Sequence, residues 1–275
     1  MSQAMESFIE QIVRKAVTEQ LGSSSVGSHP YQRKALVVAN WKMNMELKDI
    51  HQFVQNFRND DEHVVICPSF PYLFPLKAML KERNPAISIG AQNIHWEKAG
   101  AYTGDVSASQ IKDIGCDYVL VGHSERRAAG ETDEQVNQKT LAALSHQIKP
   151  IICVGETEVE KRQNQTNQVV TNQVLLALNG IKDVTNIVIA YEPVWAIGSG
   201  QSASAEQAQE VHQSIRSLLL KTYGDVGDQV QILYGGSVKP ANVHLFSVMK
   251  DIDGVLVGGA SLKADDFAAI TQAFL

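Results

Sequence analysis

From Lys34 to the end of the chain, short apolar runs alternate with stretches of helical periodicity, and no other feature constrains the fold as strongly. A continuous apolar run bounded by turn residues is typical of a strand buried on both faces of a parallel sheet. The intervening stretches carry apolar residues at helical spacing, as in Ile50, Phe53 and Phe57. We therefore predict eight strands, at Ala35–Ala39, Val64–Cys67, Ala86–Ala91, Tyr118–Val121, Pro150–Val154, Ile187–Ala190, Val230–Leu233 and Gly254–Val257.

Eight strand–helix units in succession predict an α/β fold in which the strands close into a (β/α)8 barrel. Such strands are joined by right-handed crossovers, and a barrel of this kind needs about 250 residues. An open doubly wound sheet would usually carry a glycine-rich turn after its first strand. Here that turn is Asn40–Asn44, which contains no glycine. We therefore expect the barrel to span residues 34–275.

Residues 1–33 differ in kind from the repeating part of the chain. Gly22 ends a stretch of helical periodicity, and the Ser- and Gly-rich residues 23–30 are typical of a flexible linker. We expect a tethered amphipathic helix before the barrel, which is either a docking element or an addition without a catalytic role. Charges interrupt any signal-peptide core, and acidic residues count against a mitochondrial presequence. The apolar stripe of this helix is formed by Phe8, Ile9, Ile12, Val13, Ala16, Val17 and Leu21.

Composition narrows the class of function. A formal net charge of −6 argues against nucleic acid as the general partner. No apolar run reaches the roughly 18 residues that a membrane span needs. The three cysteines, Cys67, Cys116 and Cys153, lie in apolar segments, which is typical of reduced and buried thiols in a cytoplasmic protein. No histidine or cysteine spacing indicates a metal site.

A carboxylate stands just past the sixth predicted strand, within the segment Tyr191–Gly200. In parallel barrels the carboxyl ends of the strands form the catalytic rim, so Glu192 is a candidate catalytic residue. Pro193 restricts the backbone directly after it, whereas Gly198 and Gly200 free the backbone further on. A segment with a restricted backbone at its start and a flexible one at its end is typical of a hinged lid that excludes water from a reactive intermediate.

Two further candidates follow other strands. Lys42, after the first strand, carries a point charge suited to a phosphate or a developing oxyanion. His123 lies where the fourth strand gives way to a helix, whose N-terminus favours the neutral imidazole over the charged ring. A neutral imidazole can donate a hydrogen bond to a carbonyl oxygen and carry a proton.

Glycine-rich turns follow the last two predicted strands, at Tyr234–Ser237 and Gly258–Ser261. In a (β/α)8 barrel this is the expected place for a phosphate, which backbone N–H groups bind at close range. The sequence therefore predicts a phosphate site beside the catalytic rim.

Together these groups indicate proton transfer on a small phosphorylated carbonyl compound. Glu192 would remove a proton next to the carbonyl, while His123 and Lys42 stabilise the enediolate oxygens. There is no nicotinamide-binding fingerprint. Lys34 and Lys149 precede their predicted strands and Lys42 follows its own, so no lysine within a strand is placed to form a Schiff base. An enediol phosphate readily eliminates phosphate, and a lid that holds the phosphate suits this chemistry.

The motifs resemble the signature set of the triosephosphate isomerase family, whose fold is the TIM barrel, and the similarity runs from about Lys34 to Leu275. The family is itself a standard illustration of a carboxylate base, a neutral histidine and a closing lid. The segments that carry the resemblance are Asn40–Asn44, Gly122–Arg127, Tyr191–Gly200, Tyr234–Ser237 and Val257–Ser261.

The resemblance implies a role for each matching residue. It implies a catalytic set of Glu192, His123, Lys42 and Asn40, a phosphate site of Gly198, Ser237, Gly258 and Gly259, and supporting roles for Glu125, Arg126 and Thr103. It also implies an enzyme of glycolysis and gluconeogenesis that needs no cofactor. The family usually forms a homodimer, in which a loop matching Gln92–Val106 inserts into the partner and Thr103 helps to position Lys42.

Three features depart from the family pattern. Ser199 stands where threonine is common, and the stretch 128–131 is one residue shorter than usual, which bears on packing behind His123. The N-terminal helix has no counterpart in the family core. It resembles the short helices that route enzymes into bacterial microcompartments, which suggests a shell or docking partner for residues 1–22.

Two alternative functions remain open at this point. A paralogous isomerase of a phosphorylated tetrulose or related sugar would need the same base and phosphate turns. A non-catalytic barrel that serves as a scaffold or binding module is the alternative from another class, against which the complete motif set argues.

Overall fold

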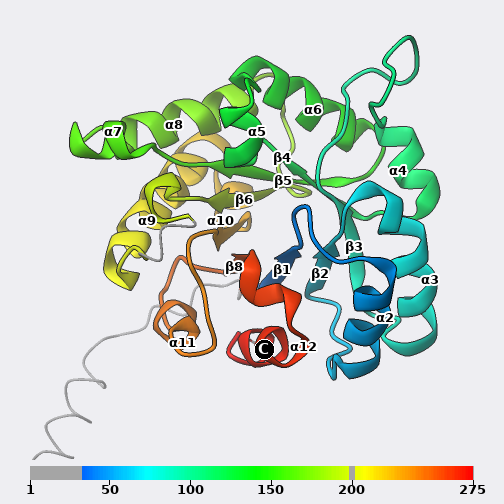
Figure 1. Cartoon of the computed structure of the whole chain (residues 1–275). Coiled ribbons are helices and arrows are strands. Elements are labelled where there is room, and N and C mark those ends of the chain that lie inside the picture. The colour runs from blue at the N-terminus through cyan, green and yellow to red at the C-terminus, as the bar shows by residue number, and fades with distance from the viewer. Residues whose placement is uncertain (1–32, 198–201, 275) are drawn as a thin grey trace, which may run out of the picture. The chain divides into compact units, whose positions relative to one another are not determined.

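The computed structural model describes residues 33–197 and 202–274, and its centre is a closed barrel of eight parallel strands in sequence order. Figure 1 shows the ring of strands with the helices around it. The strands are β1 (Leu36–Asn40), β2 (Val64–Cys67), β3 (Ser88–Ala91), β4 (Tyr118–Val121), β5 (Lys149–Val154), β6 (Val188–Tyr191), β7 (Gln231–Tyr234) and β8 (Gly254–Val257).

Helices connect successive strands and cover the outside of the barrel (Figure 1). Five of them, α2, α4, α6, α7 and α9, begin with a capping box. In the last four, a Ser or Thr accepts a hydrogen bond from a backbone N–H of the first turn. The helices are α2 (Leu47–Asn56), α3 (Leu73–Arg83), α4 (Ala108–Ile114), α5 (Ser124–Ala128), α6 (Asp133–Ser145), α7 (Glu158–Arg162), α8 (Thr166–Ala177), α9 (Ala205–Tyr223), α10 (Asp225–Asp228), α11 (Val243–Ser247) and α12 (Ala264–Gln272), with short 3-10 turns η1 (Phe70–Tyr72), η2 (Val194–Ala196) and η3 (Gly259–Leu262).

The predicted (β/α)8 barrel is confirmed, and the predicted strand positions agree with the observed ones to within two residues. One prediction was wrong: Lys149 does not precede its strand but is the first residue of β5. Its side chain is exposed at the end of the barrel opposite the catalytic rim, so this correction leaves the argument against a Schiff base intact. The predicted N-terminal helix and linker lie outside the described residues. Within the described ranges, no helix is long and apolar enough to cross a bilayer.

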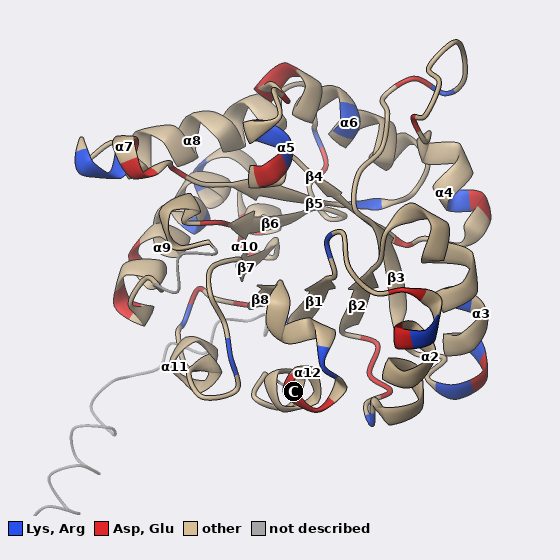
Figure 2. Cartoon of the chain, viewed as in Figure 1, with Lys and Arg blue, Asp and Glu red and all other residues tan. Residues whose placement is uncertain are grey.

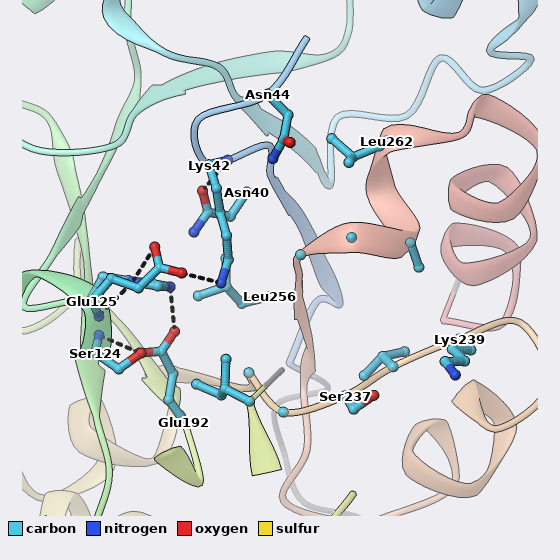
Figure 3. A pocket seen from close by; sticks show the side chains of 18 of the residues that line it. Asn40, Lys42, Asn44, Ser124, Glu125, Glu192, Ser237, Lys239, Leu256 and Leu262 are labelled. Atoms are coloured by element: carbon cyan, nitrogen blue, oxygen red, sulfur yellow. Dashed lines mark hydrogen bonds and ion pairs between the residues drawn. The ribbon is translucent and has the colours of Figure 1, made fainter. Parts of the chain in front are cut away.

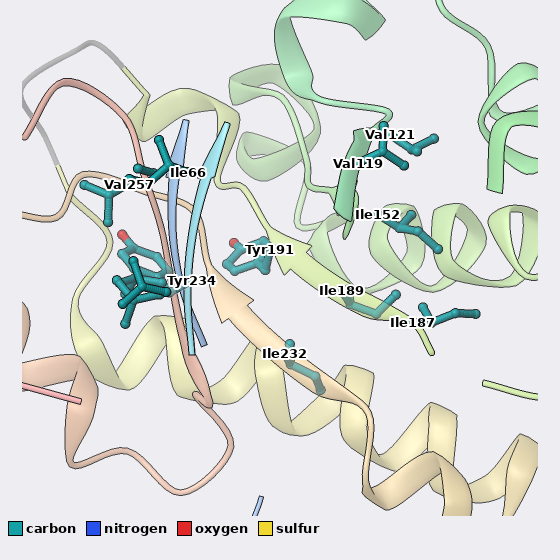
Figure 4. Close-up of a cluster of buried hydrophobic side chains, with 14 of the residues drawn as sticks. Ile66, Val119, Val121, Ile152, Ile187, Ile189, Tyr191, Ile232, Tyr234 and Val257 are labelled. Carbon is teal, nitrogen blue, oxygen red and sulfur yellow. The ribbon is translucent and has the colours of Figure 1, made fainter. Parts of the chain in front are cut away.

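Strand periodicity divides the core into two layers. Side chains on one face of each strand fill the barrel interior, among them Leu36, Val38, Val188 and Ala190. Those on the other face pack between the strands and the helices, as Figure 4 shows for Ile189 and its neighbours. Because successive residues of a strand alternate between faces, the inward set of β1 continues to Asn40, and that of β6 continues to the residue just past its end. Alternation therefore directs these polar groups to the mouth of the barrel.

A network of charges ties β7, β8 and α9 together at the amino-terminal end of the barrel. The Asp253 carboxylate accepts hydrogen bonds from Arg33 Nε at 2.6 Å and from the Ile232 backbone N–H at 2.8 Å, and it also contacts Arg216. Burial raises the pKa of Asp253, although both guanidinium groups oppose this shift. Buried charges of this kind are tolerated because each finds a partner.

His212 of α9 is fully buried, and burial lowers its pKa to about 4. Its Nδ1 lies 2.7 Å from the Ala208 carbonyl oxygen, to which the neutral ring donates. The unfolded chain takes up a proton at this histidine below about pH 6.5, whereas the folded chain does so only near the lowered pKa. Its contribution to stability is therefore complete above about pH 6.5 and is lost as the pH falls toward 4.

We expect His212→Asn to remove the pH dependence of stability that His212 causes, because asparagine retains an amide donor but does not titrate. The difference in unfolding free energy between wild type and variant should shrink by about 2 kcal/mol from about pH 7.5 to about pH 5. Urea unfolding at both pH values, with protein concentration held constant, measures it. An equal difference at the two pH values would contradict the buried neutral histidine.

Candidate active site

A pocket of about 920 Å³ opens at the carboxyl ends of the strands, and most of the predicted site residues line it (Figure 3). Of the remaining predicted residues, Arg126 and Thr103 are exposed and do not line the pocket, and Gly198 lies outside the described residues. The predicted residues that line it are Asn40, Lys42, His123, Glu125, Glu192, Ser237, Gly258 and Gly259.

Glu192 directly follows β6, and only 2% of its surface is exposed. Its Oε2 accepts a hydrogen bond from the Ser124 backbone N–H at 2.9 Å. Two glycines make room for this residue. A Cβ on Gly155 would meet the Glu192 carbonyl oxygen at 1.8 Å, and one on Gly235 would meet its Cγ at 2.8 Å. The carboxylate is therefore held in a narrow, largely dry position at the mouth of the barrel.

His123 is the N-cap of α5, and its Nδ1 accepts a hydrogen bond from the Glu125 backbone N–H at 3.2 Å. A nitrogen that accepts carries no proton, so this contact places the ring proton on Nε2. Nε2 lies 3.0 Å from Glu192 Oε1. The imidazole therefore presents its N–H to the base and to the pocket.

The buried side chains of Glu192 and His123 shift each other's pKa. Burial lowers the pKa of His123, but the charge of Glu192 and its hydrogen bond outweigh burial, so the net shift is upward. This direction is opposite to the one predicted from the helix N-terminus alone, and the contact with Glu192 is the reason. Burial raises the pKa of Glu192, but His123, the Ser124 N–H and Lys42 together bring it below the usual range. In this arrangement Glu192 is ionised at neutral pH.

Lys42 has a left-handed backbone with φ of 51°, which is uncommon for a residue other than glycine and typical of functional sites. Its N–H donates to Asn40 Oδ1 at 3.0 Å, and its Nζ lies 2.7 Å from Glu125 Oε1. Gln92 Nε2 and Ser69 Oγ donate to its carbonyl oxygen at 2.8 and 3.0 Å. Asn40, Gln92 and Ser69 thus stabilise the backbone that aims the lysine into the pocket.

The two glycine-rich turns lie on the opposite side of the pocket from Glu125 (Figure 3). Among the described residues, no acceptor binds the backbone N–H groups of Ser237, Gly258 or Gly259. A Cβ on Gly258 would lie 3.4 Å from Lys42 Cε, an ordinary van der Waals contact, so the lysine stem passes close to the turn. Three unpaired N–H groups beside an ammonium group can bind an anion such as phosphate.

The chain after Glu192 is held by Glu156, a buried residue that follows β5. Its side chain accepts hydrogen bonds from Trp195 Nε1 at 2.8 Å and from Tyr191 Oη at 3.1 Å, and its carbonyl oxygen accepts from Val194 N at 3.1 Å. Lys161 Nζ lies 2.9 Å from the centroid of the Trp195 ring. The stiff start predicted from Pro193 is therefore reinforced by contacts between different loops.

Sequence reasoning missed several of these contacts. Glu156 stands just past a strand, the position used to find Glu192, and that signal could have found it. Arg127, the neighbour of the predicted Arg126, binds the Gly122 carbonyl oxygen at 2.7 Å and Asp133 Oδ1 at 2.6 Å. Arg126 forms no ion pair with the described residues. Adjacent arginines on a short helix point in different directions, which spacing alone does not reveal.

Comparison with known proteins identifies the family of the chain. The family model for triosephosphate isomerase matches residues 35–274. A triosephosphate isomerase of Carboxydothermus hydrogenoformans is 48% identical over 249 residues, which cover 87% of this chain and 98% of the relative. One from Alkaliphilus oremlandii is 46% identical over 246 residues, covering 86% and 98%, and one from Endomicrobium trichonymphae is 46% identical over 251 residues, covering 87% and 98%. Because the match spans the whole barrel, the chain belongs to the triosephosphate isomerase family.

Proposed function

We propose that Glu192 is the base of the reaction and that His123, Lys42 and Asn40 complete the catalytic set. The reaction is the interconversion of dihydroxyacetone phosphate and D-glyceraldehyde 3-phosphate, the activity of the family to which the chain belongs. The observation that carries the assignment is the buried Glu192 carboxylate, 3.0 Å from His123 Nε2, in a pocket where three N–H groups have no acceptor among the described residues. The relatives described above carry the name of the triose enzyme, which disfavours the tetrulose alternative.

Glu192 moves one proton between neighbouring carbons of the substrate. To reach that proton, the carboxylate leaves the Ser124 N–H and His123, which are its partners in this structure. His123 then loses the interaction that raises its pKa, so the ring is neutral when it donates through Nε2 to a substrate oxygen. Lys42 stabilises the negative charge that develops on the enediolate.

The phosphate of the substrate binds the N–H groups of Ser237, Gly258 and Gly259, and Gly198 adds a fourth from the expected lid. Lys42 lies between this turn and Glu125, 2.7 Å from the Glu125 carboxylate. Glu125 therefore holds the lysine in place until substrate arrives, while Arg126 supports the rim from outside the pocket.

A homodimer is proposed from the family and from the exposed apolar groups of two loops. Met43, directly after Lys42, is 95% exposed, and Tyr102 on the protruding loop Gln92–Val106 is 43% exposed. The centroids of the His95 and Tyr102 rings lie 4.2 Å apart, so the loop presents packed aromatic rings. Thr103, exposed on the same loop, would reach the partner's Lys42.

Residues 1–33 are proposed to act as a docking element, separate from the barrel domain at residues 34–275. The apolar stripe of residues 1–22 suits a shell or scaffold protein, which would place a cytoplasmic enzyme inside a bacterial microcompartment. This proposal rests on the sequence pattern and on its resemblance to targeting helices.

The substitution Glu192→Asp keeps the charge but shortens its reach by about one methylene. We expect kcat to fall about 100-fold or more, because a displacement of this size removes the near-attack geometry. The KM and the inhibition constant of inorganic phosphate should change less than about twofold, since the N–H groups that bind phosphate are untouched. Glu210→Asp, on the exposed surface of α9, is the matched control. Wild-type turnover by Glu192→Asp would refute the base assignment.

Deletion of residues 1–30 tests whether the docking segment is separate from catalysis. We expect kcat and KM to stay within about twofold of the full chain, because every described pocket residue lies after residue 33. A collapse of activity would show instead that the segment supports the barrel. Co-localisation of a tagged residue 1–22 peptide with a candidate shell protein would test docking itself, and a diffuse peptide would count against it.

Substrate preference separates the two isomerase functions. We expect kcat/KM for D-glyceraldehyde 3-phosphate to exceed that for a tetrose phosphate by about 100-fold, because an extra hydroxymethyl group must fit a pocket built for a triose. A hydroxamate analogue of the enediolate should inhibit both reactions, which shows that they share one site. A preference for the tetrose phosphate would overturn the triose assignment.

A further inference from the structure

We propose that Lys239 captures the phosphate dianion at the mouth of the pocket and so raises kcat/KM without taking part in the chemistry. This inference rests on the proposed function, because it concerns the same phosphorylated substrate. Lys239 lines the pocket two residues after Ser237, and its side chain is exposed. Figure 3 shows Lys239 and Ser237 on one side of the pocket, with Glu125 and Ser124 on the other. The lysine therefore stands on the side where the phosphate is expected to bind.

The charges that line the pocket explain why such a group is needed. Glu192 must be ionised to act as a base, and its negative charge repels a phosphate dianion. Lys42 lies only 2.7 Å from Glu125, which offsets much of its field. Apart from His123, the charged lining consists of three ammonium groups and three carboxylates, namely Lys42, Lys239, Lys263, Glu125, Glu192 and Asp266. The formal charges of these six side chains cancel, so a cation near the path of the dianion attracts it most strongly where no carboxylate lies beside that cation.

Lys239 is farther from carboxylate neighbours in the sequence than Lys263, the other exposed lysine of this comparison. Lys263 is followed by Asp265 and Asp266 in the first turn of α12 (Figure 2), and these carboxylates weaken its field. Lys239 is followed by Pro240, Ala241 and Asn242, none of which is charged. It forms no ion pair in the part of the chain that the structure describes.

The backbone at Lys239 is fixed relative to the phosphate turn. Asn242 bridges the loop, because its Oδ1 accepts from Lys239 N at 2.7 Å and its Nδ2 donates to the Ser237 carbonyl oxygen at 3.2 Å. Val243 N also donates to the Lys239 carbonyl oxygen at 3.0 Å. The lysine is thus tied to the residue whose N–H is expected to bind phosphate, while its flexible stem stays in solvent. Such a charge attracts a ligand over a distance, and dissolved salt screens it.

The test is the salt dependence of kcat/KM in Lys239→Gln, which removes the charge and keeps a polar side chain. At about 10 mM ionic strength, where the Debye length is about 30 Å, we expect kcat/KM to fall about threefold to tenfold below wild type. Near 0.3 M the gap should close to less than about twofold, and kcat should be unchanged at both salt concentrations. Lys239→Glu should lower kcat/KM further and make it rise with salt.

Matched variants separate this role from a general effect of net charge. Lys221→Gln removes an exposed charge from the last turn of α9, which does not line the pocket, and it should match wild type at all salt concentrations. Lys263→Gln should show a smaller loss than Lys239→Gln. The inhibition constant of inorganic phosphate, measured by competition, should rise in Lys239→Gln at low salt only.

Three results would overturn the inference. The first is an equal kcat/KM of Lys239→Gln and Lys221→Gln at low salt. The second is a loss of kcat/KM in Lys239→Gln that does not depend on salt. The third is a fall in kcat of Lys239→Gln together with kcat/KM. The last two would make the lysine a direct contact of the bound substrate. A wild-type protein without isomerase activity would refute the proposed function instead, so the two failures are distinguishable.

Discussion

Closure of the barrel between β1 and β8 is the constraint on which the rest of this structure depends. The two strands pair in parallel, with Leu36 opposite Gly254, and a Cβ on Gly254 would lie 1.8 Å from the Leu36 carbonyl oxygen. Glycine is therefore required for the last strand to approach the first. Once the ring is closed, the carboxyl ends of all eight strands face one mouth, and residues more than 200 positions apart line one pocket.

The charged groups of the site are paired with one another. Glu192 lies against His123 and the Ser124 N–H, and Lys42 lies against Glu125. Pairing makes burial of these groups tolerable, because an isolated charge in such a place would be strongly destabilising. The proposed reaction exchanges these partners for substrate oxygens. The phosphate turns differ, since their N–H groups have no acceptor among the described residues and are available at once.

Much of the fold and site could be predicted from local pattern. Apolar runs locate the strands, and the position just past a strand end is enough to select Glu192 and His123. Contacts between loops could not be predicted in this way. Glu156 binds Trp195, Gln92 binds the Lys42 backbone, and Arg127 binds the Cys153 carbonyl oxygen. Each contact joins segments that are separate in the chain and meet only in the folded barrel. The same holds for His123, because the upward shift of its pKa comes from Glu192, 69 positions away in the chain.

The sequence by itself determined the fold class, the inward direction of Asn40 and Glu192, and the residue types at the rim. These follow from the period of the strand and from turn chemistry, which act over a few residues. Only the tertiary structure decided which charges pair. It also decided which N–H groups have no acceptor, and that Lys239 at the pocket mouth has no carboxylate partner, within residues 33–197 and 202–274. Electrostatic interactions depend on distance in space and on burial, and neither quantity exists until the barrel has closed.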